Sequence, residues 1–259
     1  MKICFVSDLH QDIGHQPLIK WPEADVLVVA GDTANSLGEV VKFFQKLQRK
    51  SPYPHVLTVD GNHEHYSNAP TERTVEETRS RLVELLPPSV TFLPAHDSVK
   101  IGDLHFVGRN GWYSFDYAGD PIANRAIWRE EMNDCKWIGF DKLLQPPPWE
   151  LAEQDAMIVT AEIASIIARE PDAKIIVITH TAPHRDLINS DPRFLRTNAF
   201  YVNTWMQRVL EDFGSNIVLW QYGHTHFRTE KMINGVYCIA NPRGYPSENP
   251  SWEPIVIDL

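Results

Sequence analysis

The sequence is poor in cysteine and has no long apolar segment. Its three cysteines, Cys4, Cys135 and Cys238, are odd in number and widely spaced, and no CxxC pair occurs. This usage favours reduced thiols in a cytosol-like compartment. No stretch approaches the roughly 18 apolar residues of a membrane span, and the start MKICFVSDLH is charged too early for a signal peptide. We therefore expect a cytoplasmic protein without a membrane partner.

Positive charge is also in short supply. The 259 residues include 24 Lys and Arg against 34 Asp and Glu, which gives a formal net charge of −10. An acidic surface exerts no long-range attraction on nucleic acid or anionic lipid. It does not exclude a phosphate-bearing substrate, because bound cations can reverse the local sign. No repeat, low-complexity segment or linker stands out, so we expect a single domain over residues 1–259.

Five short runs rich in Val and Ile share one arrangement. Each run is five or six residues long and ends at a polar residue; these residues are Asp8, Asp32, Asn62, His180 and His224. The runs show no alternation of apolar and polar residues, which is typical of strands buried on both faces. They predict an α/β fold with strands at the centre.

Helices are predicted between these strands. Two capping boxes, Ser36 with Glu39 and Thr74 with Glu77, each precede an apolar stripe. Residues from about 150 to 169 and from about 199 to 213 have helical spacing as well.

Other segments have different patterns. Residues 90–112 predict strands joined by a Gly-Asp turn, and the C-terminal third is β-rich with an Asn-Gly hairpin signal. Between 113 and 150 the pattern weakens, and three prolines at 146–148 argue against regular structure there. We interpret 113–150 as a possible lid or insertion.

Polar side chains cluster directly after the strands. They are Asp8, His10, Asp32, Asn62, His63, His180, His224 and His226. Ligands of α/β sheets gather beyond the carboxyl ends of the strands, and so many uncompensated polar groups would be costly to bury. A mixed set of carboxylate, amide and imidazole groups without thiolate suits Mn, Fe, Zn, Ni or Co better than Ca or Mg. The set is too large for one ion and about right for two ions that share a carboxylate.

The blocks DLH, GD, GNHE, TH and GHTH occur in this order from residue 3 to about residue 245. In this respect the chain resembles the calcineurin-like metallophosphoesterase superfamily. The resemblance implies a four-layer α/β/β/α sandwich, with two mixed β-sheets flanked by helices. It implies one metal held by Asp8, His10 and His226, and a second held by Asn62, His180 and His224, with Asp32 as the bridge. It also implies that His63 is the proton donor near the leaving group.

These roles predict a metal-dependent phosphoric ester hydrolase. Two divalent transition-metal ions would activate a bridging hydroxide against phosphodiesters or phosphomonoesters of small organic phosphates, with Asp32 and His63 as catalytic residues. The segment GDTANSLG lacks the phosphate-binding arginine of Ser/Thr protein phosphatases, which argues against that activity. Arg109 and Arg243 are the substrate-binding candidates instead.

Several alternatives stay open. One is a nuclease or cyclic-nucleotide phosphodiesterase, and one from another class is a non-catalytic protein-binding scaffold of the same fold. Glu64 either supports His63 and the site or is an unrelated surface acid, and His65 and His105 are predicted to be structural. We further hypothesise that diesters are hydrolysed at least as well as monoesters, with Arg243 as an auxiliary phosphate contact. The substrate, the native metal and the oligomeric state are left undefined by the sequence.

Overall fold

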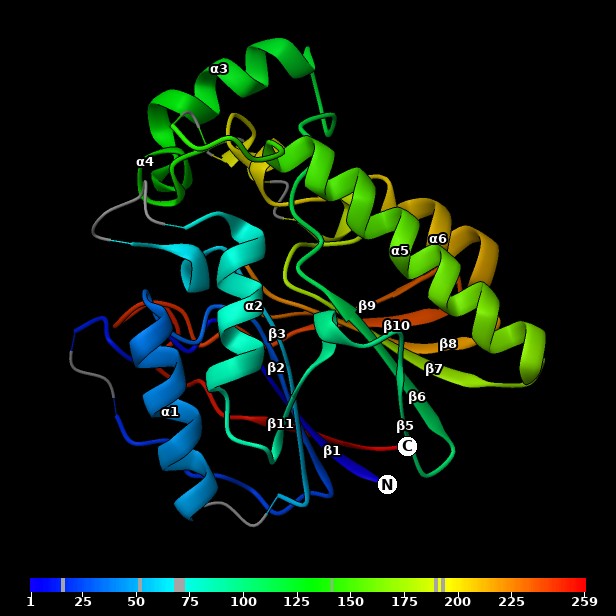
Figure 1. Cartoon of the computed structure of the whole chain (residues 1–259). Coiled ribbons are helices and arrows are strands. Elements are labelled where there is room, and N and C mark those ends of the chain that lie inside the picture. Colours follow the sequence, from blue (N-terminus) through cyan, green and yellow to red (C-terminus); the bar gives the residue numbers. More distant parts are fainter. Residues whose placement is uncertain (15–16, 51–52, 68–72, 141, 189–190, 192–193) are drawn as a thin grey trace.

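Two β-sheets lie face to face between helices in the computed structural model of the chain (Figure 1). The structure describes residues 1–14, 17–50, 53–67, 73–140, 142–188, 191 and 194–259. Within this part of the chain, no helix is both long and apolar enough to cross a membrane.

The first sheet has five strands, with β1 near its centre. Their order is β11 (Ile255–Asp258), β1 (Lys2–Val6), β2 (Val26–Ala30), β3 (His55–Val59) and β4 (Val90–Phe92). Strands β1 to β4 run parallel, and β11 pairs with β1 in the antiparallel direction. The carboxyl ends of β1, β2 and β3 therefore lie at one edge.

The second sheet has six strands and antiparallel pairs at both edges. Their order is β5 (Val99–Ile101), β6 (Leu104–Arg109), β7 (Lys174–Thr179), β8 (Ile217–Tyr222), β10 (Val236–Ala240) and β9 (Thr229–Ile233). The four inner strands run parallel. Both predicted turns are present: Gly102 connects β5 to β6 with a positive φ, and Asn234 and Gly235 connect β9 to β10 with positive φ at both positions.

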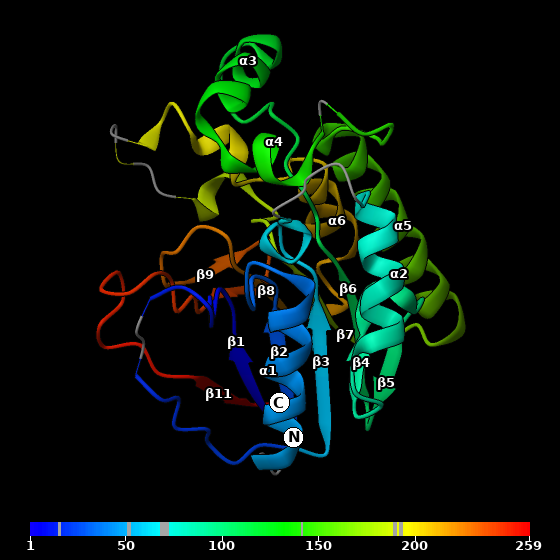
Figure 2. The ribbon, with the colours of Figure 1, turned by 60° about the vertical axis from the view of Figure 1, so that its left-hand side comes forward.

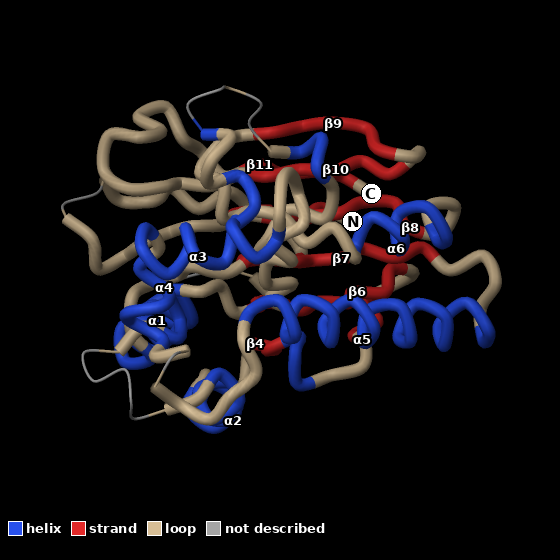
Figure 3. The backbone as a smooth tube through the Cα atoms, turned by 90° about the horizontal axis from the view of Figure 1, so that it is seen from above, coloured by secondary structure: helices blue, strands red, loops and turns tan. Residues whose placement is uncertain are grey.

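Successive side chains of the strands enter different apolar layers. In β1, Ile3 and Phe5 pack between the two sheets, whereas Cys4 and Val6 pack beneath the helices α1 (Leu37–Lys50) and α2 (Val75–Leu85). Helices α5 (Pro148–Arg169) and α6 (Met206–Phe213) cover the outer face of the second sheet (Figure 3). This arrangement explains why the strand sequences do not alternate, and it confirms the predicted fold class of two mixed sheets flanked by helices.

The helix starts agree in part with the predictions. Thr74 and Glu77 form a reciprocal capping box at α2, and the amide of Glu39 donates to Ser36 Oγ at 3.4 Å. The helix predicted from residue 199 begins only at Met206. Regular structure also starts earlier than expected at the prolines, because Pro148 is the first residue of α5. Proline is well tolerated there, since the first helical turn does not use its amide.

The segment 113–150 is more ordered than its sequence suggests. It contains α3 (Pro121–Glu131) and α4 (Asn133–Ile138), which lie above the carboxyl ends of the strands (Figure 2). Trp112, Tyr113, Phe115 and Trp128 form an aromatic cluster that fixes the segment to the rest of the fold. These four aromatic residues are thus part of a packed layer.

Candidate metal centre

The polar side chains that follow β1, β2, β3, β7 and β8 converge at the carboxyl edge of the two sheets. Two groups of potential ligands have all their donor atoms within 4.8 Å of one another: Asp8, His10, Asp32 and His226 form one, and Asp32, His180 and His224 form the other. Asn62 joins the second group, since its Oδ1 lies 3.1 Å from His180 Nε2. The structure therefore brings all of the predicted metal ligands together. We call Asp8, His10 and His226 the first half-site, and Asn62, His180 and His224 the second half-site.

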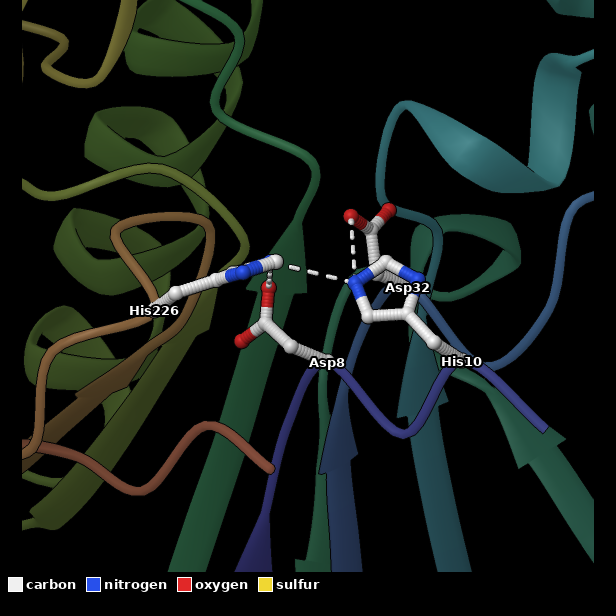
Figure 4. A group of neighbouring side chains, drawn as sticks. All are labelled: Asp8, His10, Asp32 and His226. Carbon is white, nitrogen blue, oxygen red and sulfur yellow. Dashed lines mark hydrogen bonds and ion pairs between the residues drawn. The ribbon is translucent and has the colours of Figure 1, made fainter. Parts of the chain in front are cut away.

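In the first half-site, imidazole nitrogens and carboxylate oxygens face one another (Figure 4). His10 Nε2 lies 3.1 Å from His226 Nε2, and His226 Nε2 lies 3.5 Å from Asp8 Oδ1. Asp8 Oδ2 is buried, and it has no hydrogen-bond partner among the described residues. A buried carboxylate oxygen without a donor is costly, whereas a divalent cation would satisfy it. The residues present thus fit a metal of the Mn, Fe, Zn, Ni or Co class.

Asp32 presents one oxygen to both half-sites. Its Oδ1 accepts the amide of His63 at 2.9 Å. Its Oδ2 lies 3.3 Å from His180 Nε2 and 3.9 Å from His10 Nε2. Gly61 makes this placement possible, because a Cβ at that position would collide with Asp32 Oδ1. Asp32 therefore faces both half-sites with the same oxygen.

Three of the imidazoles are oriented by an acceptor behind them. His180 Nδ1 donates to the carbonyl of Ala30 at 2.8 Å, and His224 Nε2 donates to the carbonyl of Phe200 at 2.9 Å. His226 Nδ1 donates to Glu248 Oε2 at 2.6 Å. In each ring the opposite nitrogen is left to face the centre, which is how metal-ligating histidines are usually held.

The electrostatics of the centre follow from burial and from Asp32. Burial disfavours the charged form of Asp32, but His180 and His63 outweigh it and hold the pKa of Asp32 well below its usual range. Burial opposes charge on His180 too, yet Asp32 raises the pKa of His180 to about 10. Burial lowers the pKa of His224 to about 3 and the pKa of His10 well below its usual value. Neutral imidazole is the form that binds a metal, and these two histidines are held in it.

The backbone at the centre is strained. Five ligand residues have positive φ angles: Asp8 (50°), His10 (41°), Asp32 (54°), His224 (66°) and His226 (55°). Each such conformation costs a non-glycine residue on the order of 1–3 kcal/mol, and such residues cluster at functional sites. The strand ends therefore adopt an unfavourable backbone that aims side chains at a common point.

His63 lies beside the two half-sites and belongs to neither ligand group. It opens a short 3-10 turn (His63–His65) directly after Asn62. Its Nδ1 is hydrogen bonded to Asn35 Oδ1, and its Nε2 lies 3.3 Å from the hydroxyl of Tyr245 and 3.7 Å from Asp32 Oδ2. The ring stacks on Tyr66 with centroids 4.3 Å apart. One nitrogen is thus anchored, and the other faces the centre.

Glu64 supports the turns that carry the ligands. Its carboxylate accepts the amides of Asp32 at 2.9 Å, Thr33 at 2.7 Å and Gly61 at 2.7 Å. It therefore joins the ends of β2 and β3, and the alternative of an unrelated surface acid does not hold.

The two histidines that were predicted to be structural pair away from the centre. His65 contacts Asp60 at 2.8 Å, and His105 contacts Glu170 at 3.0 Å. Both contacts fit the structural roles predicted for these residues.

The two candidate substrate-binding arginines are not brought to the centre. Arg109 is buried against α5, where it pairs with Glu162 and donates to backbone carbonyls. Arg243 donates to the carbonyl of Pro17 and lies 5.5 Å above the ring of Trp252, in a separate hollow. Each guanidinium is engaged in holding a segment of the fold, so the structure does not support a phosphate contact for either.

A cavity of about 460 Å³ opens over the centre. Its floor includes Asp32, Asn62, His63, His224 and His226, and its walls combine aromatic and apolar side chains with polar ones, among them Glu131, Asn133, Asn198, Thr225, Glu248 and Asn249. The wall residues include Tyr66, Met132, Ile188, Phe194, Tyr201, Phe227 and Tyr245. A small organic molecule could enter the cavity and reach the ligand residues.

Several residues around the centre were not predicted from the sequence. Asn35 lies only three positions after Asp32, so its proximity along the chain was a usable signal. Glu248 and Asp134, which contact His226 and Asn62, lie 22 and 72 residues away from their partners in sequence. No local motif predicts either contact, and both become apparent only in the folded structure.

Comparison with known proteins agrees with this geometry. The chain is 24% identical to the uncharacterized protein L509 of Acanthamoeba polyphaga mimivirus over 239 residues, which are 88% of this chain and 81% of that one. Among solved structures, a phosphopantetheinyl hydrolase from Mycobacterium tuberculosis superposes with a TM-score of 0.78 and 19% identity, over 99% of this chain and 95% of that chain. A dimetal phosphatase from Danio rerio superposes with a TM-score of 0.51 and 12% identity, over 92% and 86% of the two chains. The family model for calcineurin-like phosphoesterases matches residues 1–228, and with its ligand residues gathered at one edge of two mixed sheets, the chain belongs to that family.

Proposed function

We propose that the protein is a dinuclear-metal-dependent phosphoesterase that hydrolyses small organic phosphate esters in the cavity above the half-sites. The observation that carries this proposal is the single carboxylate oxygen of Asp32 that faces both half-sites, 3.3 Å from His180 Nε2 and 3.9 Å from His10 Nε2. When bound, two divalent cations would neutralise charge on the phosphoryl oxygens and lower the pKa of bound water.

His63 is suited to the role of proton donor. A side-chain amide oxygen can only accept, so the contact with Asn35 Oδ1 places a proton on His63 Nδ1. The second nitrogen, Nε2, is then the site that gains and loses a proton, and it faces the cavity beside Tyr245. Protonated at Nε2, His63 can deliver that proton to the departing oxygen of the ester, a contribution of typically ~10²–10⁴-fold.

The walls of the cavity favour a diester over a monoester. A monoester brings a further negative oxygen that calls for a cation, whereas a diester brings a second alcohol arm that calls for apolar contact. Among the described residues that line the cavity there is no lysine or arginine. Met132, Ile188, Phe194 and Phe227 offer apolar surface instead. Diesters are therefore expected to react at least as well as monoesters.

The test compares kcat/KM for bis-p-nitrophenyl phosphate and p-nitrophenyl phosphate, with Mn²⁺ added to metal-stripped protein. Asp32→Asn is the control for contaminating phosphatase. A phosphopantetheinyl ester belongs in the substrate panel, because the neighbour from Mycobacterium tuberculosis is named for hydrolysing that group. We expect Mn²⁺-dependent turnover, with the diester at least as good as the monoester.

Other results would redirect the assignment. A strong preference for the monoester would reject the diester specificity and keep the phosphoesterase. Turnover confined to cyclic nucleotides or single-stranded DNA would identify a cyclic-nucleotide phosphodiesterase or a nuclease. Two bound ions without hydrolysis of any ester would favour a non-catalytic scaffold.

A further inference from the structure

Asp134 is a wholly buried carboxylate in α4 that contacts the second half-site from behind. Its Oδ1 accepts Asn62 Nδ2 at 2.8 Å and the hydroxyl of Tyr66 at 2.5 Å. Its Oδ2 accepts the hydroxyl of Tyr113 at 2.7 Å, and Trp128 Nε1 donates to that same hydroxyl at 2.8 Å. Donor groups from two separate segments, the turn after β3 and the segment after β6, thus converge on one side chain.

The amide of Asn62 has two chemically different ends, and only one of them can bind a metal. The carbonyl oxygen has lone pairs, whereas the amide nitrogen is a donor only. An ionised carboxylate is an acceptor only. Asp134 therefore obliges Asn62 to turn Nδ2 toward it, and Oδ1 is left facing His180 Nε2 at 3.1 Å.

We propose that Asp134 is a positioning residue, which selects Oδ1 of Asn62 as the ligand atom and so sets the metal affinity of the second half-site. The inference rests on the proposed dinuclear function. It also gives the segment 113–150 a role other than that of a free lid, because α4 carries the residue that orients a ligand.

Asp134→Asn tests the proposal by metal binding alone, without substrate. The variant keeps the size of the side chain, but it loses the charge and one of the two acceptor atoms on which Asn62, Tyr66 and Tyr113 converge. Isothermal titration of metal-free protein with Mn²⁺ counts the bound ions and their affinities. We expect one binding step to stay unchanged and the other to weaken about 10–100-fold, as for other residues that orient a metal ligand.

Tyr113→Phe is the matched control. It removes another hydrogen bond to the same buried carboxylate, on Oδ2, without touching Asn62. We expect both binding steps to keep their wild-type affinities. Equal weakening in Asp134→Asn and Tyr113→Phe would mean that general packing matters, and the proposal would be overturned.

The double variant Asn62→Asp with Asp134→Asn reverses the polarity of the contact. The amide introduced at position 134 can then donate to one oxygen of the carboxylate introduced at position 62, and the other oxygen is presented to the metal. We expect the second binding step to recover to within a fewfold of wild type. A folded double variant that binds only one ion, or a folded Asp134→Asn that binds two with wild-type affinity, contradicts the proposal.

Circular dichroism and thermal unfolding establish that each variant folds. If Asp134→Asn alone fails to fold, recovery of both fold and second ion in the double variant supports the proposal. If neither folds, the carboxylate is required for the fold itself, and the positioning role is rejected. A wild-type protein that binds both ions but hydrolyses no ester would reject the proposed function and leave this inference standing.

Discussion

The two half-sites use similar ligands but are supported by different parts of the molecule. The second half-site is held from behind by the core: the carbonyls of Ala30 and Phe200 orient His180 and His224, and the buried Asp134 orients Asn62. All of these contacts are inaccessible to solvent. An ion bound there would be surrounded by packed side chains.

The first half-site is held partly by a surface loop. His226, whose side chain is 18% exposed, is oriented by Glu248, whose side chain is 42% exposed. Burial opposes charge on His226, but its hydrogen bond to Glu248 outweighs this and raises the pKa of His226. The centre thus consists of one half-site supported by the core and one supported by a loop, so we expect the first half-site to release its ion more readily.

The largest expected effect concerns the residue that the half-sites share. Asp32→Asn keeps the shape but removes the charge that faces both half-sites, so activity should fall by about 10³-fold or more. Metal analysis of the purified variant should find fewer than two ions per chain. Near-normal turnover, with contaminating phosphatase excluded, would contradict the proposal that both half-sites share the Asp32 carboxylate. The two half-sites would then not be coupled through this residue.

The next effect concerns His63, which belongs to neither half-site. His63→Ala should keep both ions, and its activity on esters with poor leaving groups should fall by about 10²–10⁴-fold. The loss on p-nitrophenyl esters should be much smaller, because nitrophenolate departs without a proton. An equal loss on both kinds of ester, or the loss of an ion, would assign His63 to the metal centre itself.

A smaller effect should separate the half-sites directly. Glu248→Gln removes the charge behind His226 and should weaken one Mn²⁺ binding step by about 10–100-fold, with the other step unchanged. Glu131→Gln is the matched control, because Glu131 also lines the cavity but pairs with Arg196 at 2.8 Å. If both binding steps weaken equally in Glu248→Gln, the half-sites do not have separate supports.

The smallest effect concerns Tyr245, which packs against three histidines at the first half-site and beside it. Its ring centroid lies 4.6 Å from that of His10 and 4.8 Å from that of His226. Its hydroxyl lies 3.3 Å from His63 Nε2. Tyr245→Phe keeps the packing and removes one neutral hydrogen bond of about 1 kcal/mol, so kcat should change about fivefold. A change of a hundredfold or more would place the hydroxyl on the substrate.

The fold class and the gathering of the predicted ligands at one edge could be predicted from the sequence, because their signals are local. Each predicted metal ligand lies within a few residues of a buried strand, and parallel strands bring their carboxyl ends together. Asp134 and Glu248 have no such signal, because each is distant in sequence from the residue that it contacts. Helix α4, which carries Asp134, packs within the aromatic cluster and has no local sequence pattern of its own.

The arginines show how a local signal can mislead. Val107 of β6 packs toward α5, so the alternation of a strand places Arg109 on that same face, where Glu162 meets it. Arg109 is the last residue of β6 rather than a residue that follows the strand, and this position decides which way its side chain points.

The left-handed backbone at five ligand positions limits how this chain can diverge. At φ angles between 41° and 66°, branched residues such as valine or threonine are strongly disfavoured, whereas glycine, asparagine and aspartate are tolerated. In a descendant that no longer needed these side chains for metal binding, we would therefore expect glycine, asparagine or aspartate at five positions: Asp8, His10, Asp32, His224 and His226. In such a descendant, glycine, asparagine or aspartate at the ends of the strands would mark the positions of the five residues.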